Sequence, residues 1–360
     1  ALQAVVTLLP HETTEIVLTF GAAQSIDHVR QLVERYRTLD FEKTLAAQQQ
    51  LWRGSVDQVQ VKTPDPSFDI MMNGWLLYQT ISCRMWARSG FYQASGASGF
   101  RDQLQDSMTL AHVRPDLARS HILLAASRQF EEGDFQHWWL PETGAGVRTH
   151  ISDDTAWMAH CTAYYVKLTG DSEILNERVA FLNGRPVAAG EHDAFYIPAA
   201  TPHDATLYDH CVLALARNMQ AGEHGLPLMG TGDWNDGMNR VGEHGRGESI
   251  WLGWFLCNTL TAFEEIAASR GDVPRATQYA ERRRALAEAI DQQGWDGAWF
   301  RRAYFDDGTP LGTSLSDECR IDTIAQSWAV LSGVADDDKA KTAMANVESH
   351  LIDWTDGIAQ

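Results

Sequence analysis

The sequence has little cysteine and no long apolar run, and both absences narrow the class of protein. Its five cysteines are scattered and none belongs to a C-x-x-C pair, which argues against a disulfide framework. We therefore expect reduced thiols and a cytoplasmic setting. No apolar stretch approaches the ~20 residues of a membrane-spanning helix. The first residues also lack the basic segment that opens a signal peptide.

Basic residues are also scarce, since the formal net charge at pH 7 is -19. An acidic surface repels phosphate groups, so neither nucleic acid nor an anionic membrane is expected as a partner. A site for an anion would need local arginines. Walker A, Rossmann, G-x-S-x-G and H-E-x-x-H patterns are all missing, so we expect no cofactor and no metal.

What the sequence does contain is a long, apolar and tryptophan-rich chain. Its 360 residues are 44% hydrophobic, enough for a sizeable core, and its 13 tryptophans suit either burial or stacking on a sugar face. Residues 1–22 alternate in hydrophobicity around a turn-like HETT segment and predict two strands, the tail of a β domain. Residues 25–50 have apolar positions at a spacing of three and four and predict a connecting helix.

The chain from Phe68 onward predicts one helix after another. Residues 69–88 are apolar on nearly every face and predict a buried inner helix, whereas residues 275–293 are amphipathic and charged. The alternation of apolar helices with amphipathic, charged helices predicts inner and outer rings of helices. An Asn-Gly turn within residues 178–199 predicts a β-hairpin inserted between helices. Other predicted helices cover residues 115–130, 152–170, 203–220, 247–271 and 322–333.

Four segments between these helices combine acids, glycines and aromatic residues: 88–106, 137–157, 224–239 and 316–333. In a ring of helices, the loops at the same end of the helices surround one opening of the ring. Their composition suits a polyol ligand, although every segment also has a purely structural interpretation.

The first and fourth segments illustrate both interpretations. Asp102 and Asp106 are four residues apart and share a helical face, where they could contact a ligand or stabilise the start of a helix. Asp322, Gln326 and Trp328 lie at the start of an apolar helix. A buried Gln beside a Trp could bind sugar hydroxyls, or it could be a core residue with its hydrogen bonds satisfied.

The second and third segments place tryptophan beside acids. Trp138 and Trp139 could pack in the core or contact a ligand. Asp236 is a candidate general acid, because burial against Trp234 would raise the pKa of its carboxyl group. Asp233 fits a turn cap equally well.

The sequence resembles glycoside hydrolase family 94, the inverting phosphorylases, in four motifs that occur in the family's order. They are YQASGASGFRDQLQD, HWWLPETGAGVRTHISDD, HGLPLMGTGDWNDGMNRVGEHGRGESIWL and IDTIAQSWAVLSG. The likeness runs from about residue 1 to residue 333. It is strongest to the β-1,2-glucan branch, which comprises β-1,2-oligoglucan phosphorylases and the C-terminal domain of cyclic β-1,2-glucan synthases.

The resemblance implies a mainly α fold in three parts. Residues 1–22 would end an N-terminal β-sandwich, residues 23–66 would form a helical linker, and residues 67–360 an incomplete (α/α)6 barrel. The family holds phosphate partly through a His and a Thr-Gly that would lie beyond Gln360. We therefore expect this chain to be a piece of a longer protein.

The resemblance also implies roles for individual residues. Asp236, the second aspartate of the D-W-N-D motif, would be the catalytic acid, and Trp234 would line the donor-sugar subsite. Arg88 or Arg84 would contact phosphate. The other expected substrate-binding residues are Arg101, Asp102, Asp106, Asp233, Asp322, Gln326 and Trp328.

The expected reaction is phosphorolysis of a β-glucosidic bond with inversion, giving α-glucose 1-phosphate. The expected partners are a β-linked gluco-oligosaccharide and inorganic phosphate as co-substrate, with a homodimer left open. One alternative is an inverting hydrolase that uses Asp153, Asp154 or Glu248 as base, although the two aspartates also fit a helix N-cap and the glutamate a first-turn acid. The other alternative is a glucan-binding or chain-length-controlling module without catalysis.

Overall fold

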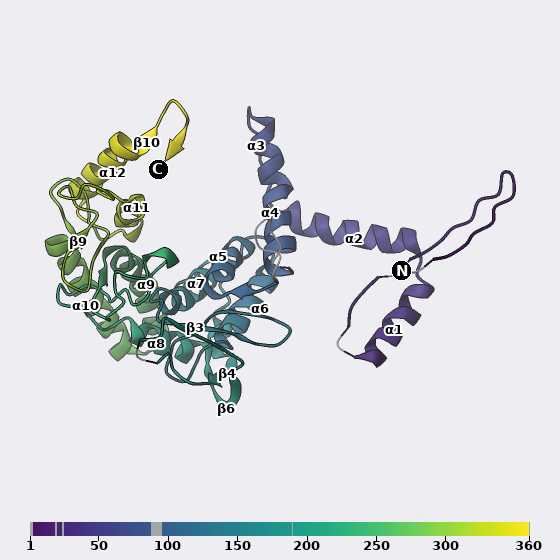
Figure 1. The fold of residues 1–360 in the computed structure, drawn as a ribbon, viewed down its shortest axis with the longest axis horizontal. Helices are drawn as coiled ribbons and strands as arrows, with labels where there is room; N and C mark the ends of the chain where they lie inside the picture. Colours follow the sequence, from purple (N-terminus) through teal and green to yellow (C-terminus); the bar gives the residue numbers. More distant parts are fainter. Residues whose placement is uncertain (1–2, 19, 24, 88–95, 189, 360) are drawn as a thin grey trace. The chain divides into compact units, whose positions relative to one another are not determined.

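The computed structural model describes residues 3–18, 20–23, 25–87, 96–188 and 190–359. The chain divides into two compact units, Ala1–Gln58 and Val59–Gln360. The second unit carries all of the candidate site residues, and Figure 1 shows its helices and strands in chain order.

The first unit contains two helices, whereas a single connecting helix was predicted for residues 25–50. Helix α1 (Ile26–Arg37) begins where the Ser25 hydroxyl accepts a hydrogen bond from the backbone of the first turn, and α2 (Phe41–Val56) begins in the same way at Asp40. A tight turn forms near His11, within the HETT region. No strand is assigned to the described residues 3–18 and 20–23, so the two predicted strands are not seen. Isolated hairpins are marginal without further strands to pair with, and the β-sandwich assignment stays a prediction.

The second unit opens with a nearly continuous helical stretch. It consists of α3 (Pro66–Ile70), a π-turn (Met71–Trp75), α4 (Leu76–Gln79) and a second π-turn (Thr80–Met85). The helix was predicted correctly, but its burial was not. Only Leu77 and Ile81 are buried, because the described elements cover one side of the stretch alone. The exposed apolar residues are Phe68, Ile70, Met71, Trp75, Leu76, Tyr78 and Trp86.

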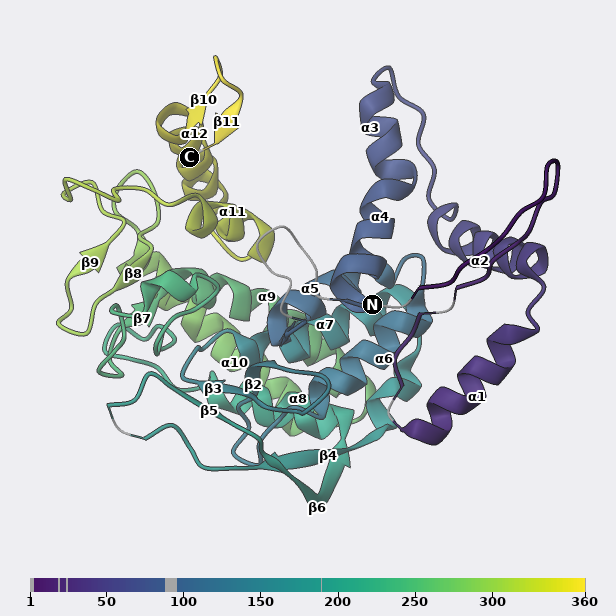
Figure 2. The same cartoon turned by 45° about the vertical axis from the view of Figure 1, so that its right-hand side comes forward.

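Eight longer helices follow and alternate between two environments (Figure 2). The helix α9 is buried along most of its length and packs against α7, α10 and α11, whereas α10 buries only Tyr279 and Leu286. The predicted contrast between a buried inner helix and a charged outer helix is seen in this pair, but the described helices do not show a closed barrel. The bounds are α5 (Phe100–Leu110), α6 (Pro115–Ala126), α7 (Asp154–Thr169), α8 (Leu207–Arg217), α9 (Ile250–Ser269), α10 (Val273–Ala289), α11 (Thr323–Ser332) and α12 (Asp337–Leu351). Helix α12 was not predicted.

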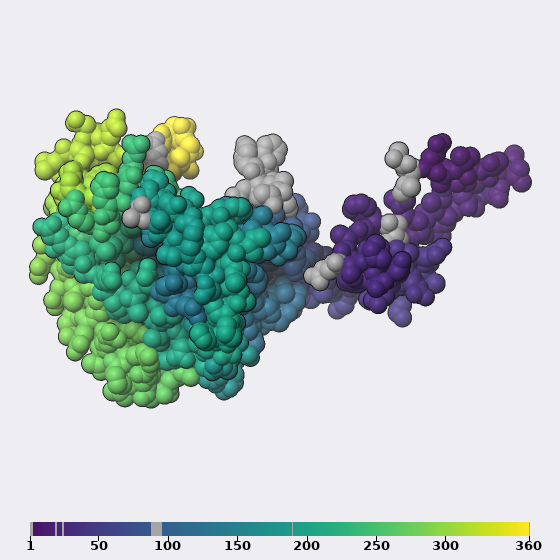
Figure 3. All heavy atoms as spheres, turned by 60° about the horizontal axis from the view of Figure 1, so that its bottom comes forward, coloured from purple at the N-terminus to yellow at the C-terminus, as the bar shows by residue number. Residues whose placement is uncertain are grey.

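Short strands connect these helices. One antiparallel sheet has the order β1 (Ser98–Gly99), β2 (Gln136–Trp139), β3 (Gly146–Thr149), β5 (Asp193–Tyr196). A second pairs β4 (Arg178–Asn183) with β6 (Ala199–Thr206), and Figure 3 shows the teal segments that include them covering the viewer's face of the second unit. The remaining strands are β7 (Glu248–Ser249), β8 (Ala303–Tyr304), β9 (Pro310–Leu311), β10 (Ile352–Asp353) and β11 (Ile358–Ala359).

The predicted hairpin in residues 178–199 is wrong in its pairing. Strand β4 pairs with β6, while the intervening β5 joins the other sheet. A β-carbon on Gly184 would lie 2.5 Å from the Tyr196 ring, so the Asn-Gly pair permits close packing of that ring rather than a two-residue turn. Trp138 and Trp139 likewise lie on β2 and not in a loop.

Candidate active site

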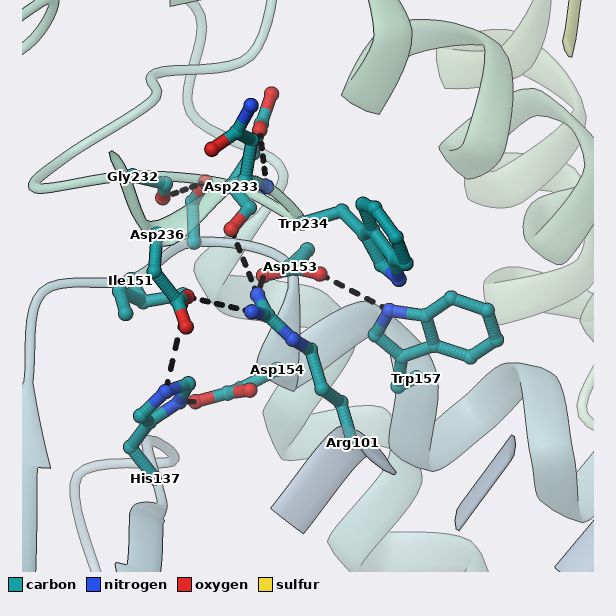
Figure 4. Close-up of polar contacts among 12 residues, drawn as sticks. Arg101, His137, Ile151, Asp153, Asp154, Trp157, Gly232, Asp233, Trp234 and Asp236 are labelled. Carbon is teal, nitrogen blue, oxygen red and sulfur yellow. Dashed lines mark hydrogen bonds and ion pairs between the residues drawn. The ribbon is translucent and has the colours of Figure 1, made fainter. Parts of the chain in front are cut away.

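The inner helices point their N-terminal ends toward one group of charged side chains (Figure 4). Arg101 lies in the first turn of α5, and Asp153 and Asp154 lie at the start of α7. The loop carrying Asp233 and Asp236 crosses these helix ends. Three of the four predicted segments are therefore brought together here.

Arg101 joins these loops to one another. Its Nη1 donates to Asp153 Oδ1 at 2.9 Å and to the backbone oxygen of Asp233 at 2.7 Å, and its Nη2 donates to Asp236 Oδ1 at 2.5 Å. Burial opposes the charge of this guanidinium group, but Asp153, Asp154 and Asp236 outweigh that effect and raise its pKa. The guanidinium group of Arg101 is always charged and donates through several N–H groups, so it fixes the position of Asp236, the candidate acid.

Asp153 does not cap α7 through its side chain, contrary to the N-cap interpretation. Its carboxylate is fully buried and accepts hydrogen bonds from Arg101 and, at 3.0 Å, from Trp157 Nε1. Burial raises the pKa of this carboxyl group. With both oxygens engaged and no exposed surface, Asp153 is poorly placed to activate a water molecule.

Asp236 is the exposed member of the group. Its side chain is 58% exposed, and besides Arg101 it faces His137 Nε2 at 3.7 Å. Partial burial would raise the pKa of Asp236, but His137 and Arg101 outweigh burial and lower it below its ordinary value. The expectation that the Trp234 ring raises this pKa is therefore wrong for the ligand-free site. Trp234 is 45% exposed, and its Nε1 donates to Gln105 at 3.3 Å.

His137 was not predicted from the sequence as a site residue. It lies on β2, where its Nδ1 contacts Asp154 Oδ2 at 2.8 Å. Burial alone would lower the pKa of His137, but the carboxylates of Asp154 and Asp236 raise it to about 10. The imidazole is therefore a cation at neutral pH. Its place beside Trp138 in the quoted HWW motif was the one available signal.

Asp233 was predicted to bind substrate, and the structure gives it a different role. Its two oxygens accept a forked pair of hydrogen bonds from Arg302 at 2.7 and 2.6 Å, and the Ser249 hydroxyl adds a third at 2.7 Å. Asp233 and Arg302 are 0% and 1% exposed. The Asp233 side chain therefore anchors the loop and offers no free oxygen to a sugar. Arg302 carried no recognisable sequence signal.

Two predicted residues on α11 also have structural roles. Gln326 is buried, and its amide exchanges hydrogen bonds with the Phe300 backbone at 2.8 and 2.7 Å, so it is the satisfied core glutamine rather than a sugar ligand. Asp322 caps the helix through the Ile324 backbone at 2.8 Å. Its other oxygen lies 3.4 Å from Arg302 Nε.

Other predicted residues lie around these groups. Trp328 lines a cavity of about 440 Å³ together with Gln105 and Trp157. Asp106 accepts a hydrogen bond from Arg84 Nε at 2.8 Å, and Asp102 lies in the first turn of α5 beside Gly99. Arg88 lies outside the described residues.

Glu248, an alternative base, is buried and accepts hydrogen bonds from the backbones of His224 and Leu226 and from the His224 ring at 2.5 Å. A larger cavity of about 810 Å³ is lined partly by Ile151, Gly230 and Thr231, but by none of the predicted site residues. Within the described ranges no cluster of three metal-ligating side chains occurs. No described helix combines the length and apolarity that crossing a bilayer requires.

The described part of the chain is mainly helical, with carboxylates, arginine and tryptophan gathered at helix ends. Residues 51–358 match the model of the Glycosyl hydrolase 94 superfamily, catalytic domain, and the chain belongs to this family. The family expected from the four sequence motifs is thereby confirmed.

Three relatives illustrate the range of the family. The chain is 50% identical over 340 residues to the cyclic beta-(1,2)-glucan synthase NdvB of Rhizobium meliloti (strain 1021), covering 94% of this chain and 12% of that protein. It is 31% identical over 356 residues to the 3-O-beta-D-glucopyranosyl-beta-D-glucuronide phosphorylase of Paenibacillus borealis, covering 97% and 43%. It is 26% identical over 189 residues to the 1,2-beta-oligoglucan phosphorylase of Listeria innocua serovar 6a, covering 50% and 16%. The chain thus spans less than half the length of each relative.

Proposed function

We propose that this chain is part of the catalytic domain of an inverting phosphorylase that cleaves β-glucosidic bonds in β-1,2-glucan or its oligosaccharides. The proposal is carried by one observation. Asp236 is the exposed carboxylate beside Arg101, whereas Asp153 and Asp233 are buried and both oxygens of each accept hydrogen bonds. One accessible acid is what phosphorolysis requires, whereas an inverting hydrolase needs a second carboxylate to activate water. The similarity to named phosphorylases and to a β-1,2-glucan synthase supports the substrate class.

In the proposed reaction Asp236, protonated in the substrate complex, transfers its proton to the glycosidic oxygen as the bond to the anomeric carbon breaks. An oxygen of hydrogen phosphate bonds to that carbon from the opposite face, which inverts its configuration and gives α-glucose 1-phosphate. The phosphate proton then restores the acid, so no external proton is consumed. Arg101 holds the carboxyl group in place, and Trp234 and Trp328 offer apolar faces to the sugar rings.

The test measures glucose 1-phosphate released by the full-length parent protein from β-linked oligosaccharides and phosphate. General acid catalysis contributes roughly 10²–10⁴ in rate, so Asp236→Asn should lose about that much. The matched control is Asp204→Asn, because Asp204 is also an exposed aspartate bound to an arginine, Arg178. Normal release by Asp236→Asn would refute the acid assignment. Turnover that continues without phosphate would indicate the hydrolase instead.

A second candidate is a binding role inside a glucan synthase, which the 50% identity to a cyclic β-1,2-glucan synthase favours. Calorimetry with β-1,2-oligosaccharides that shows binding, combined with no product in the phosphate assay, would support this role over catalysis.

A further inference from the structure

The proposed acid is an anion in the ligand-free site, although it must carry a proton to react. The cause is visible in the contacts of its carboxylate, which faces two cations, Arg101 at 2.5 Å and His137 at 3.7 Å. Arginine is permanently charged, so it cannot release the carboxylate by titration. His137 is the second cation, and its charge depends on its own contacts.

His137 is held in place from its other side. Its Nδ1 contacts Asp154 Oδ2 at 2.8 Å, and the side chains of His137 and Asp154 are 14% and 4% exposed. Asp154 Oδ1 has no hydrogen-bond partner among the described residues, so His137 supplies the hydrogen bond to this buried carboxylate. A carboxylate that contacts an imidazole ring at hydrogen-bond distance favours the protonated, charged form of the ring. The ring therefore stays charged and presents Nε2–H toward Asp236.

The contacting residues Asp154, His137 and Asp236 belong to three separate elements: α7, β2 and the D-W-N-D loop. We propose that His137, clamped by Asp154, is a positioning residue that holds Asp236 as an oriented anion in the empty site, so that binding of a glycoside is coupled to uptake of one proton by Asp236. The inference rests on the proposed function, because only a general acid has to be protonated in the complex.

The physical basis is a competition for the Asp236 carboxylate. A sugar that covers the carboxylate removes water and offers hydroxyl groups in place of charged donors. Both changes disfavour the anion and raise the pKa of the carboxyl group. One proton from solvent then converts the carboxylate into the acid that donates to the glycosidic oxygen. The charged groups that face this pair are Arg101 on α5, Asp153 and Asp154 on α7, and Asp233 with its partner Arg302.

The first experiment needs no turnover and can use the chain itself. Nuclear magnetic resonance would follow the His137 ring and the Asp236 carboxyl carbon through a pH titration. In His137→Gln, which keeps an N–H donor but lacks the charge, the Asp236 midpoint should rise by one pH unit or more. Asp154→Asn should lower the His137 midpoint by at least as much. The control is His203→Gln, because His203 contacts Glu131 at 2.6 Å in an exposed pair outside the site. An unchanged Asp236 midpoint in His137→Gln would overturn the inference.

The second experiment measures the coupling directly. Calorimetric titration of a β-1,2-oligosaccharide in buffers of different ionisation enthalpy should show uptake of about one proton per ligand at neutral pH, and much less for Asp236→Asn. Binding without proton uptake would overturn this inference while leaving the phosphorylase assay to decide the function. In the active parent protein, His137→Gln should move the alkaline limb of kcat/KM to higher pH. A lower rate with an unmoved limb would reduce His137 to a structural residue.

Discussion

The buried pair of Asp233 and Arg302 offers a sharp test of the site's construction. Asp233→Asn replaces one carboxylate oxygen by an amide group that cannot accept from Arg302, and it leaves a guanidinium group that is 1% exposed without its forked anionic partner and with Asp322 at 3.4 Å as its remaining ion pair. Breaking one partner of a buried ion pair costs about 3–5 kcal/mol. No discount for solvent screening applies, because Asp233 is 0% exposed.

The expected result is a loss in melting temperature on the order of 6–20 °C, given roughly 2–4 °C per kcal/mol for domains of 150–250 residues. Calorimetric or fluorescence-detected melting would measure it. Activity should fall as well, because the Asp233 backbone oxygen accepts one of the hydrogen bonds that orient Arg101.

Two controls isolate the pair. Asp204→Asn breaks an exposed pair with Arg178 and should leave the melting temperature nearly unchanged, because solvent screens such a pair. The double variant Asp233→Asn with Arg302→Gln should be less destabilised than the sum of the two single variants, because it removes both buried charges. If Asp233→Asn melts like the exposed control and only weakens glucan binding, Asp233 is a substrate contact and our assignment is wrong.

Three further outcomes are expected. Arg101→Lys should lower kcat/KM by at least 10-fold, since one ammonium group cannot reproduce the contacts of a guanidinium group to Asp153, the Asp233 backbone and Asp236; an unchanged kcat/KM would contradict this. Gly230→Ala should destabilise the loop, because its φ is +62° and an added β-carbon would lie 1.9 Å from the His150 backbone oxygen; equal melting of variant and wild type would contradict it. The pKa of His137 is raised from 6.5 to about 10, so its stabilising contribution is complete below pH 6.5 and is lost as the pH rises toward 10. The difference in unfolding free energy between wild type and His137→Gln should therefore shrink over that interval in urea titrations, and a constant difference would refute the pairing.

Local signals in the sequence accounted for most of the helices. Ser25 and Asp40 cap α1 and α2, and Asp65 with Pro66 starts α3. Each of these signals lies directly before or at the first residues of the helix that it starts. The charged, amphipathic pattern of residues 275–293 likewise predicted that α10 is an outer helix. Such signals act through neighbours along the chain, so the sequence displays them.

Predictions that depended on contacts between distant segments fared less well. The strand partners of β4 and β5 were wrong, because the choice of partner depends on how Tyr196 packs against Gly184 rather than on the Asn-Gly pair alone. The burial of residues 69–88 was wrong because an apolar surface becomes buried only if another element covers it. The ionisation state of Asp236 was wrong because its neighbours His137 and Arg101 were not known.

The sequence by itself determined the family, most helices and three segments that meet at the candidate site, since motif order and hydrophobic period are properties of the chain. Only the tertiary structure decided which acid is free. It buries Asp233 against Arg302, 69 positions away, and leaves Asp236 exposed between two cations. The reason is that burial and electrostatic interaction depend on distances in space, and those are fixed only when the helices pack.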